Sequence, residues 1–190
     1  MSTGRLEAFS DGVIAIIITI MVLGLQPPHG SDLQALRPLA PVLLAYVLSF
    51  VYVGIYWSNH HHMMHATKRV NGTILWANMH MLFWLSLVPF VTAWLGENGG
   101  AWPTALYGAV LLMAGIAYAI LERTIVASEG RDSVMARAVG RDAKAQISVA
   151  VYVVAIALAF AHERVSRVLY AAVALAWFIP DRRIEALLGE

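Results

Sequence analysis

Long apolar runs alternate with short polar segments along the whole chain. The separators are rich in Gly, Pro, Asn and charge, as in QPPHGSD, HATKRVNG and GENGGAWP. A membrane-spanning helix requires about 20 predominantly apolar residues. Six runs fit this length or nearly so, the first and last being the shortest: 11–26, 39–58, 72–95, 102–122, 144–162 and 166–180. The pattern predicts an all-α integral membrane protein with six transmembrane helices in one domain, residues 1–190.

The composition favours the same class. The chain is 59% hydrophobic and 13% charged, roughly half the charged fraction of ordinary soluble domains, and its mean hydropathy is +0.67. A formal net charge of +1 without a long basic run gives no reason to expect nucleic acid. No cysteine is available for a disulfide or a thiolate metal site. A signal peptide is disfavoured, because Glu7 and Asp11 do not suit a positive n-region and no A-x-A site follows Leu25.

Lys and Arg are unevenly distributed between the two sides that six spans define. With the N-terminus in the cytoplasm, the outer side keeps Arg37, Arg164 and Arg167. The cytoplasmic side collects the other ten: Arg5, Lys68, Arg69, Arg123, Arg131, Arg137, Arg141, Lys144, Arg182 and Arg183. This positive-inside bias predicts that both termini are cytoplasmic.

Several functional classes are disfavoured by what the apolar runs lack. From Gly12 onward their interiors contain no Asp, Glu, Lys or Arg, the residues that coupled transporters use as intramembrane relays. Pro89 is the one clear break inside a run and predicts a kink. No nucleophile elbow, phosphate loop or hydrolytic carboxylate pair occurs, so the chain is not expected to be an enzyme.

The first run carries a stripe of large aliphatic side chains. If residues 9–25 are helical, Ile16, Ile20 and Leu23 follow at i, i+4 and i+7, and Thr19 borders them. At about 1.5 Å per residue the stripe covers roughly 10 Å of depth. Such a stripe usually packs against lipid or other helices. The charges at its start and the Ala- and Gly-rich neighbouring runs, which suit close packing around a central helix, favour a functional role.

The residues that precede the stripe form a motif. Arg5, Phe9, Ser10 and Asp11 match R-x-x-x-F-S-D, followed by GVIAIIITIMVL. This start resembles the first helix of the prokaryotic homologues of transmembrane protein 175, the lysosomal potassium channel family. WSNHHHMMH and WANMHMLFWLSLVPFVTAWLGE, at 57–65 and 76–97, are similar to that family's second and third helices. The resemblance covers residues 5–97 well and the C-terminal half only by length and hydropathy.

This resemblance implies a homotetrameric, passive and weakly selective potassium channel in the cell membrane of a prokaryote. The expected partners are further copies of the chain, potassium and other monovalent cations, and the lipid bilayer; no cofactor is expected. The resemblance implies a pore lined by the first helix; because one such helix cannot enclose a pore, several subunits must then meet on an axis. The family's apolar rings replace a carbonyl filter. Counting from Asp11 places the narrowest ring on Ile16, further constrictions on Ile20 and Leu23, and a polar layer on Thr19.

The polar start of the first helix needs partners. If the spans alternate in direction, Arg5 and Asp11 lie at the same depth as the histidines that end the second span. A buried carboxylate must be paired or hydrogen-bonded, and Arg5, an imidazole and an asparagine amide are available. The resemblance likewise implies a network that fixes the angle of the pore helix. Its expected members are Arg5, Phe9, Ser10, Asp11, His60, His61, Trp76 and Asn78, with His62 and His65 as open alternatives.

The histidines of residues 60–65 are alternatively pH sensors, and two other interpretations of the chain stay open. His61 and His65 lie at i and i+4, as in zinc-binding helices, so the chain is alternatively a membrane-bound metal or haem protein that uses the histidines of residues 60–65. No carboxylate in the second run completes a ligand set, and His80 would have to come from another helix. In the third interpretation the chain is a structural membrane protein whose isoleucine stripe only packs.

Overall fold

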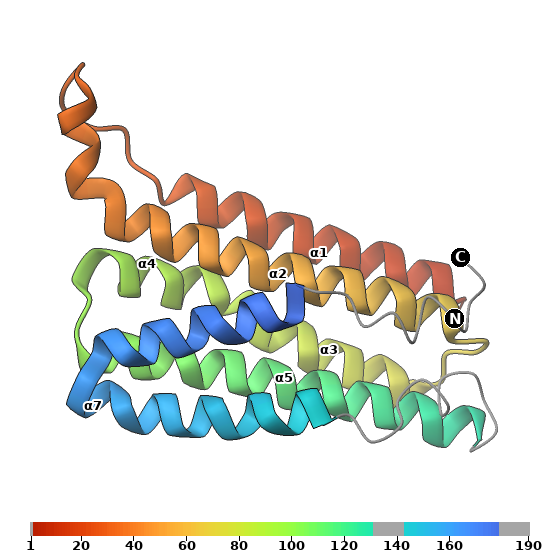
Figure 1. Cartoon of the computed structure of the whole chain (residues 1–190). Helices are drawn as coiled ribbons and strands as arrows, with labels where there is room; N and C mark the ends of the chain where they lie inside the picture. Colours follow the sequence, from red (N-terminus) through yellow and green to blue (C-terminus); the bar gives the residue numbers. More distant parts are fainter. Residues whose placement is uncertain (1, 131–142, 179–190) are drawn as a thin grey trace.

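The computed structural model describes residues 2–130 and 143–178, and the regular structure in this part is entirely helical. The helices run roughly along one axis and form a bundle (Figure 1). Among the described residues, five segments are long and apolar enough to cross a membrane. They are Thr3–Leu23, Leu33–Ala66, Gly72–Asn98, Ala101–Glu129 and Lys144–Phe178.

The first two helices are longer than their apolar runs. Helix α1 (Thr3–Leu23) begins before the predicted run of 11–26, because the polar residues up to Asp11 continue the helix toward the N-terminus. The short 3₁₀ helix η1 (Leu33–Leu39) leads into α2 (Ala40–Ala66), which extends beyond residue 58 and includes the histidines. The polar start of α1 and the polar end of α2 are therefore helical, and the contact between Glu7 and His61 places them side by side.

The third apolar run is divided into two helices. Asn71 caps α3 (Gly72–Ser86) by accepting a hydrogen bond from the backbone N–H of Ile74, and α4 (Val88–Asn98) follows after Leu87. Pro89 has no N–H for an intrahelical bond, and its ring is incompatible with continuous helix at this point. The kink predicted at Pro89 is confirmed.

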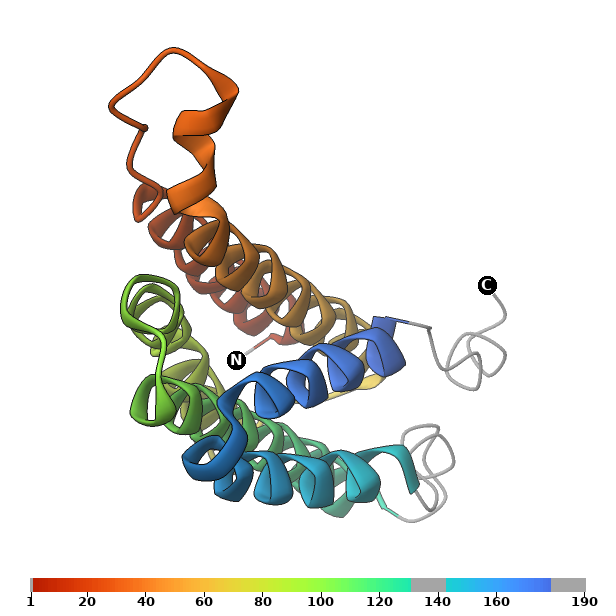
Figure 2. The same ribbon diagram turned by 60° about the vertical axis from the view of Figure 1, so that its left-hand side comes forward.

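The described residues of the C-terminal half form α5 (Ala101–Glu129) and α7 (Ala143–Phe178). The backbone of α7 is non-helical at His162, where φ is −144° and ψ is 73°. Beyond this residue the chain reverses, and Figure 2 shows the second part running back along the first. Nε1 of Trp177 donates a hydrogen bond of 2.8 Å to Oγ of Ser148, which fixes the two parts against each other.

Buried hydroxyl groups and close backbone contacts hold the bundle together. Oγ of Ser49 lies 2.6 Å from Oγ1 of Thr92 and 3.0 Å from the hydroxyl of Tyr107, which joins α2, α4 and α5. Gly108 allows Tyr170 to pack directly on the backbone of α5, because a Cβ at this position would overlap the tyrosine ring. Small residues of this kind permit the close approach on which helix packing in lipid depends. The bundle places α1 against α2, α3 and α4.

Candidate functional site

Helix α1 has one face inside the subunit and another face outside it. Leu6, Ser10, Ile14, Ile17 and Met21 recur every three or four residues and are buried against the bundle. On the outside, the exposed fractions are 58% for Ile16, 51% for Ile20 and 74% for Leu23. Thr19 is exposed beside them, and its hydroxyl donates a hydrogen bond of 2.9 Å to the carbonyl of Ile16. The predicted stripe is thus not a packing surface within the subunit.

A chain of buried hydrogen bonds ties α1 to α3 and α2. The amide Nδ2 of Asn78 donates to Oγ of Ser10 at 3.0 Å, and that hydroxyl donates to the carbonyl of Leu6. On its other side, Oδ1 of Asn78 lies 2.8 Å from Nε2 of His60, so this imidazole nitrogen carries the proton. Ser10, His60 and Asn78 are each fully buried. Nδ1 of His60 is buried and has no partner within the described residues.

Two further contacts connect α1 directly to α2. Nε1 of Trp57 donates a hydrogen bond of 3.0 Å to Oδ1 of Asp11, and Nδ1 of His61 lies 2.7 Å from Oε1 of Glu7. Glu7 and Asp11 are four residues apart on α1, and Trp57 and His61 are four residues apart on α2. The two contacts therefore lie one helical turn from each other, like rungs between antiparallel helices. The partner of Asp11 is therefore Trp57, rather than Arg5, an imidazole or an asparagine amide.

Sequence reasoning did not assign Glu7 or Trp57 to this site. The available signal was the matching step of four residues, Glu7 to Asp11 on one helix and Trp57 to His61 on the other. The remaining expected members lie outside these bonds. Arg5 is exposed without an ion pair to any described residue, while Phe9 is 49% and Trp76 74% exposed.

One group of side chains within the described residues has the composition of a metal site. Glu7, His61 and His65 each offer a ligand atom, and these atoms lie within 4.8 Å of one another. The carboxylate that α2 lacks is supplied by α1. This combination was not predicted from the sequence, because the carboxylate comes from a different apolar run than the two histidines.

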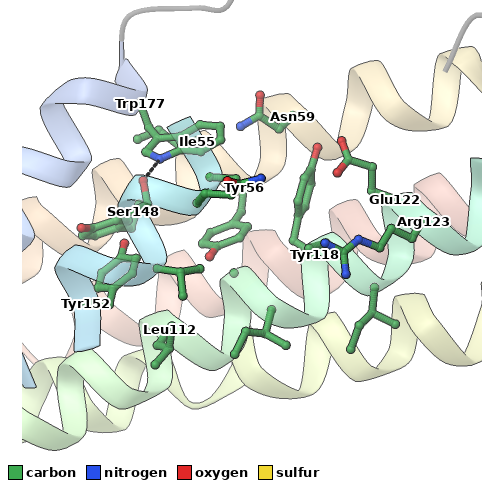
Figure 3. Close-up of a pocket in the computed structure, with 18 residues that line it drawn as sticks. Ile55, Tyr56, Asn59, Leu112, Tyr118, Glu122, Arg123, Ser148, Tyr152 and Trp177 are labelled. Atoms are coloured by element: carbon green, nitrogen blue, oxygen red, sulfur yellow. Dashed lines mark hydrogen bonds between the residues drawn. The ribbon is translucent and has the colours of Figure 1, made fainter. Parts of the chain in front are cut away.

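A cavity of about 250 Å³ lies elsewhere in the subunit, between α2, α5 and α7 (Figure 3). Its walls are mainly apolar and aromatic, and Asn59, Glu122 and Arg123 add polar groups on one side. No wall residue comes from α1. This cavity is therefore separate from both the exposed stripe and the rungs between α1 and α2.

The part of the chain that carries these contacts is also the part that matches a family of known proteins. The family model described as the endosomal/lysosomal potassium channel TMEM175 matches residues 5–89. A potassium channel of Chryseobacterium sp. (strain P1-3) is 53% identical, and the alignment covers 100% of both chains. The chain belongs to the TMEM175 family. This confirms the family indicated by the R-x-x-x-F-S-D motif.

Other TMEM175 proteins show how far the similarity extends. The crystal structure of a protein from Chamaesiphon minutus, described as a homologue of the lysosomal potassium-selective channel TMEM175, matches with a TM-score of 0.77 and 27% identity. That match covers 92% of this chain and 95% of the other. Chicken TMEM175, described as an endosomal/lysosomal proton channel, is 40% identical over 81 residues, 36% of this chain and 16% of its own length. Membership in TMEM175 does not favour the alternative of a metal or haem protein.

Proposed function

We propose that this TMEM175 protein is a passive, weakly selective potassium channel whose pore is formed where the α1 helices of four copies meet. The exposed stripe of Ile16, Ile20 and Leu23 carries the proposal. These three large aliphatic side chains lie on the outer face of a helix that is held on its other face, so the same face of further copies can meet on them. Further support comes from the relatives, which are described as potassium channels.

The proposed topology has six spans with both ends in the cytoplasm of a prokaryotic cell. Dividing α7 at His162 gives two antiparallel spans, and the joined α3 and α4 count as one. An even number of spans agrees with the excess of Lys and Arg on the side of the N-terminus. We treat residues 1–190 as one channel domain that needs neither a cofactor nor catalytic residues.

The proposed pore selects through apolar rings. A ring of Ile16 side chains forces a cation to shed part of its water without offering oxygen ligands, and potassium loses less in this than sodium because it holds water less strongly. Rings of Ile20 and Leu23 extend the constriction and can close it by dewetting. The hydroxyl of Thr19 donates to its own helix and keeps lone pairs for a passing cation.

The hydrogen bonds around the start of α1 are proposed to hold the pore helix at a fixed angle. Ser10 is tied through Asn78 to His60, while Asp11 and Glu7 are tied to Trp57 and His61. These bonds hold the polar first turns of α1 against α3 on one side and against α2 on the other. Arg5, Phe9 and Trp76, which are exposed in one subunit, are proposed to complete this network against a neighbouring copy.

Ion flux from liposomes tests the channel and the stripe together. Wild-type protein, Ile16→Asn and Val22→Asn are reconstituted and compared under potassium and sodium gradients. Val22 is the matched control, because it is also exposed on α1 but lies outside the stripe. We expect potassium-preferring flux in the wild type and a raised sodium-to-potassium ratio only in Ile16→Asn.

Three results would contradict parts of the proposal. An unchanged ratio in Ile16→Asn would remove Ile16 from the constriction. The same change in Val22→Asn would show general damage to the helix rather than a ring. No flux from correctly folded wild-type protein would favour the structural membrane protein, in which the stripe meets only lipid.

A further inference from the structure

The end of α2 places two imidazoles beside a carboxylate of α1. His61 and His65 are one turn apart on α2, and their ring centroids are 4.6 Å apart. Glu7 reaches His61 from the neighbouring helix, with 2.7 Å between Oε1 and Nδ1. The three candidate ligand atoms lie within 4.8 Å of one another. The arrangement thus comes from two different helices rather than from the histidine-rich sequence alone.

We propose that Glu7, His61 and His65 bind a divalent transition metal ion such as Zn²⁺. Zinc takes imidazole nitrogen and carboxylate oxygen at about 2.0–2.2 Å, which separates ligand atoms of a tetrahedral site by roughly 3.3–3.5 Å. The Glu7–His61 pair at 2.7 Å would have to open to admit the ion, and the three ligand atoms, which lie within 4.8 Å of one another, would have to settle at this spacing around it. Two imidazoles and one carboxylate leave a fourth position for water.

The surroundings suit a metal site better than an isolated ion pair. An ion pair between Glu7 and His61 makes no use of His65, whereas a metal ion uses all three groups. The indole of Trp57 stacks on the ring of His61 at 6.2 Å and 25°, and Trp57 is itself held by Asp11. This restricts the orientation of the His61 ring. The site is open to solution, because His65 is exposed and the His61 side chain is 42% exposed.

The ion would connect α1 to α2 at the end of the bundle where α1 begins. Thr3 donates a hydrogen bond to the carbonyl of Thr67 at this same end, so both helices are already close there. A bound ion would take the place of the direct bond between Glu7 and His61 and extend that rung to His65. The site is a property of one subunit and does not depend on where the pore lies.

Zinc binding to the whole chain in detergent tests the site. The protein is prepared without a polyhistidine tag, and zinc is titrated by calorimetry into wild type, His65→Ala, Glu7→Gln and His62→Ala. His62 is the matched control, because it neighbours His61 but does not belong to the group. We expect one zinc ion per chain and at least a tenfold weaker affinity in His65→Ala and Glu7→Gln, with His62→Ala unchanged.

Magnesium and calcium supply a second measurement. These hard cations prefer sites built wholly from oxygen ligands, so an excess of either is expected to leave zinc binding unchanged. Elution in size-exclusion chromatography checks that each variant is folded. If Glu7→Gln does not fold, the zinc affinity of His65→Ala still tests the site, because His65 is exposed and its loss should not disturb folding. The proposal is overturned if wild type binds no zinc, if His65→Ala binds as tightly as wild type, if His62→Ala loses as much, or if magnesium displaces the ion.

Discussion

The indole N–H of Trp57 donates a hydrogen bond of 3.0 Å to Oδ1 of Asp11 and thereby joins the middle of α2 to the polar start of α1. The aspartate is only partly exposed, so its charge needs a donor from the protein. One turn away, His61 and Glu7 make the second rung. An acidic residue at the start of an apolar helix is thus explained by a donor on the next helix.

Removing the indole donor while keeping an aromatic ring tests this relationship. Trp57→Phe is expected to lower the free energy of unfolding by about 1–2 kcal/mol, since a hydrogen bond to a partly buried charge is lost. For a chain of this length that corresponds to a lower Tm by about 2–4 °C per kcal/mol. Thermal unfolding in detergent measures the shift, with Trp102→Phe as the control because Trp102 is 69% exposed. Equal shifts in both variants would show that the bond to Asp11 contributes nothing specific.

The sequence predicted the apolar runs and the family, but not how the helices face one another. Periodicity identified the stripe of Ile16, Ile20 and Leu23 because it depends on one helix alone. The partners of Asp11 and Glu7 depend on the register between α1 and α2, which the intervening segment and distant packing determine. A charged residue indicates that it needs a partner, and only the fold shows that Trp57 is that partner.

Asn78 is expected to be the most sensitive residue of the buried hydrogen bonds. Asn78→Leu keeps the size of the side chain but leaves Nε2 of His60 without its acceptor and removes the donor to Oγ of Ser10, which keeps its own bond to the carbonyl of Leu6. Each buried polar group left unsatisfied costs about 1–3 kcal/mol. Thermal unfolding should therefore show a larger decrease in Tm for Asn78→Leu than for Ser10→Ala, because Ser10→Ala removes only one end of the chain of hydrogen bonds. A loss in Asn78→Leu no greater than that in Ser10→Ala would contradict a network centred on the amide.

The contact between Gly108 and Tyr170 predicts a steric effect far from the proposed pore. Gly108→Ala places a Cβ into the Tyr170 ring and within 2.9 Å of Cγ1 of Ile156, and overpacking of this kind costs about 1–3 kcal/mol. Gly115→Ala on the same helix is the control, because its Cβ would meet only the Tyr56 hydroxyl at an ordinary 3.5 Å. We expect a lower Tm for Gly108→Ala and no loss for Gly115→Ala. Equal Tm values would show that Tyr170 moves aside without cost.

The absence of cysteine from the chain makes it suited to a test of how the subunits are arranged. If α1 surrounds a shared axis, single cysteines at Ile16 or Leu23 of different copies approach one another, whereas a cysteine at Val22 lies outside the stripe. A short bifunctional maleimide applied to protein in liposomes should therefore link Ile16→Cys chains in pairs and Leu23→Cys chains in pairs, because each chain carries one thiol and the linker joins two thiols. Val22→Cys should react once per chain without linking, since its exposure is similar but its direction differs. Linked products from Val22→Cys but not from Ile16→Cys would place another face of α1 at the axis, and no linking in any variant would contradict a pore built from α1.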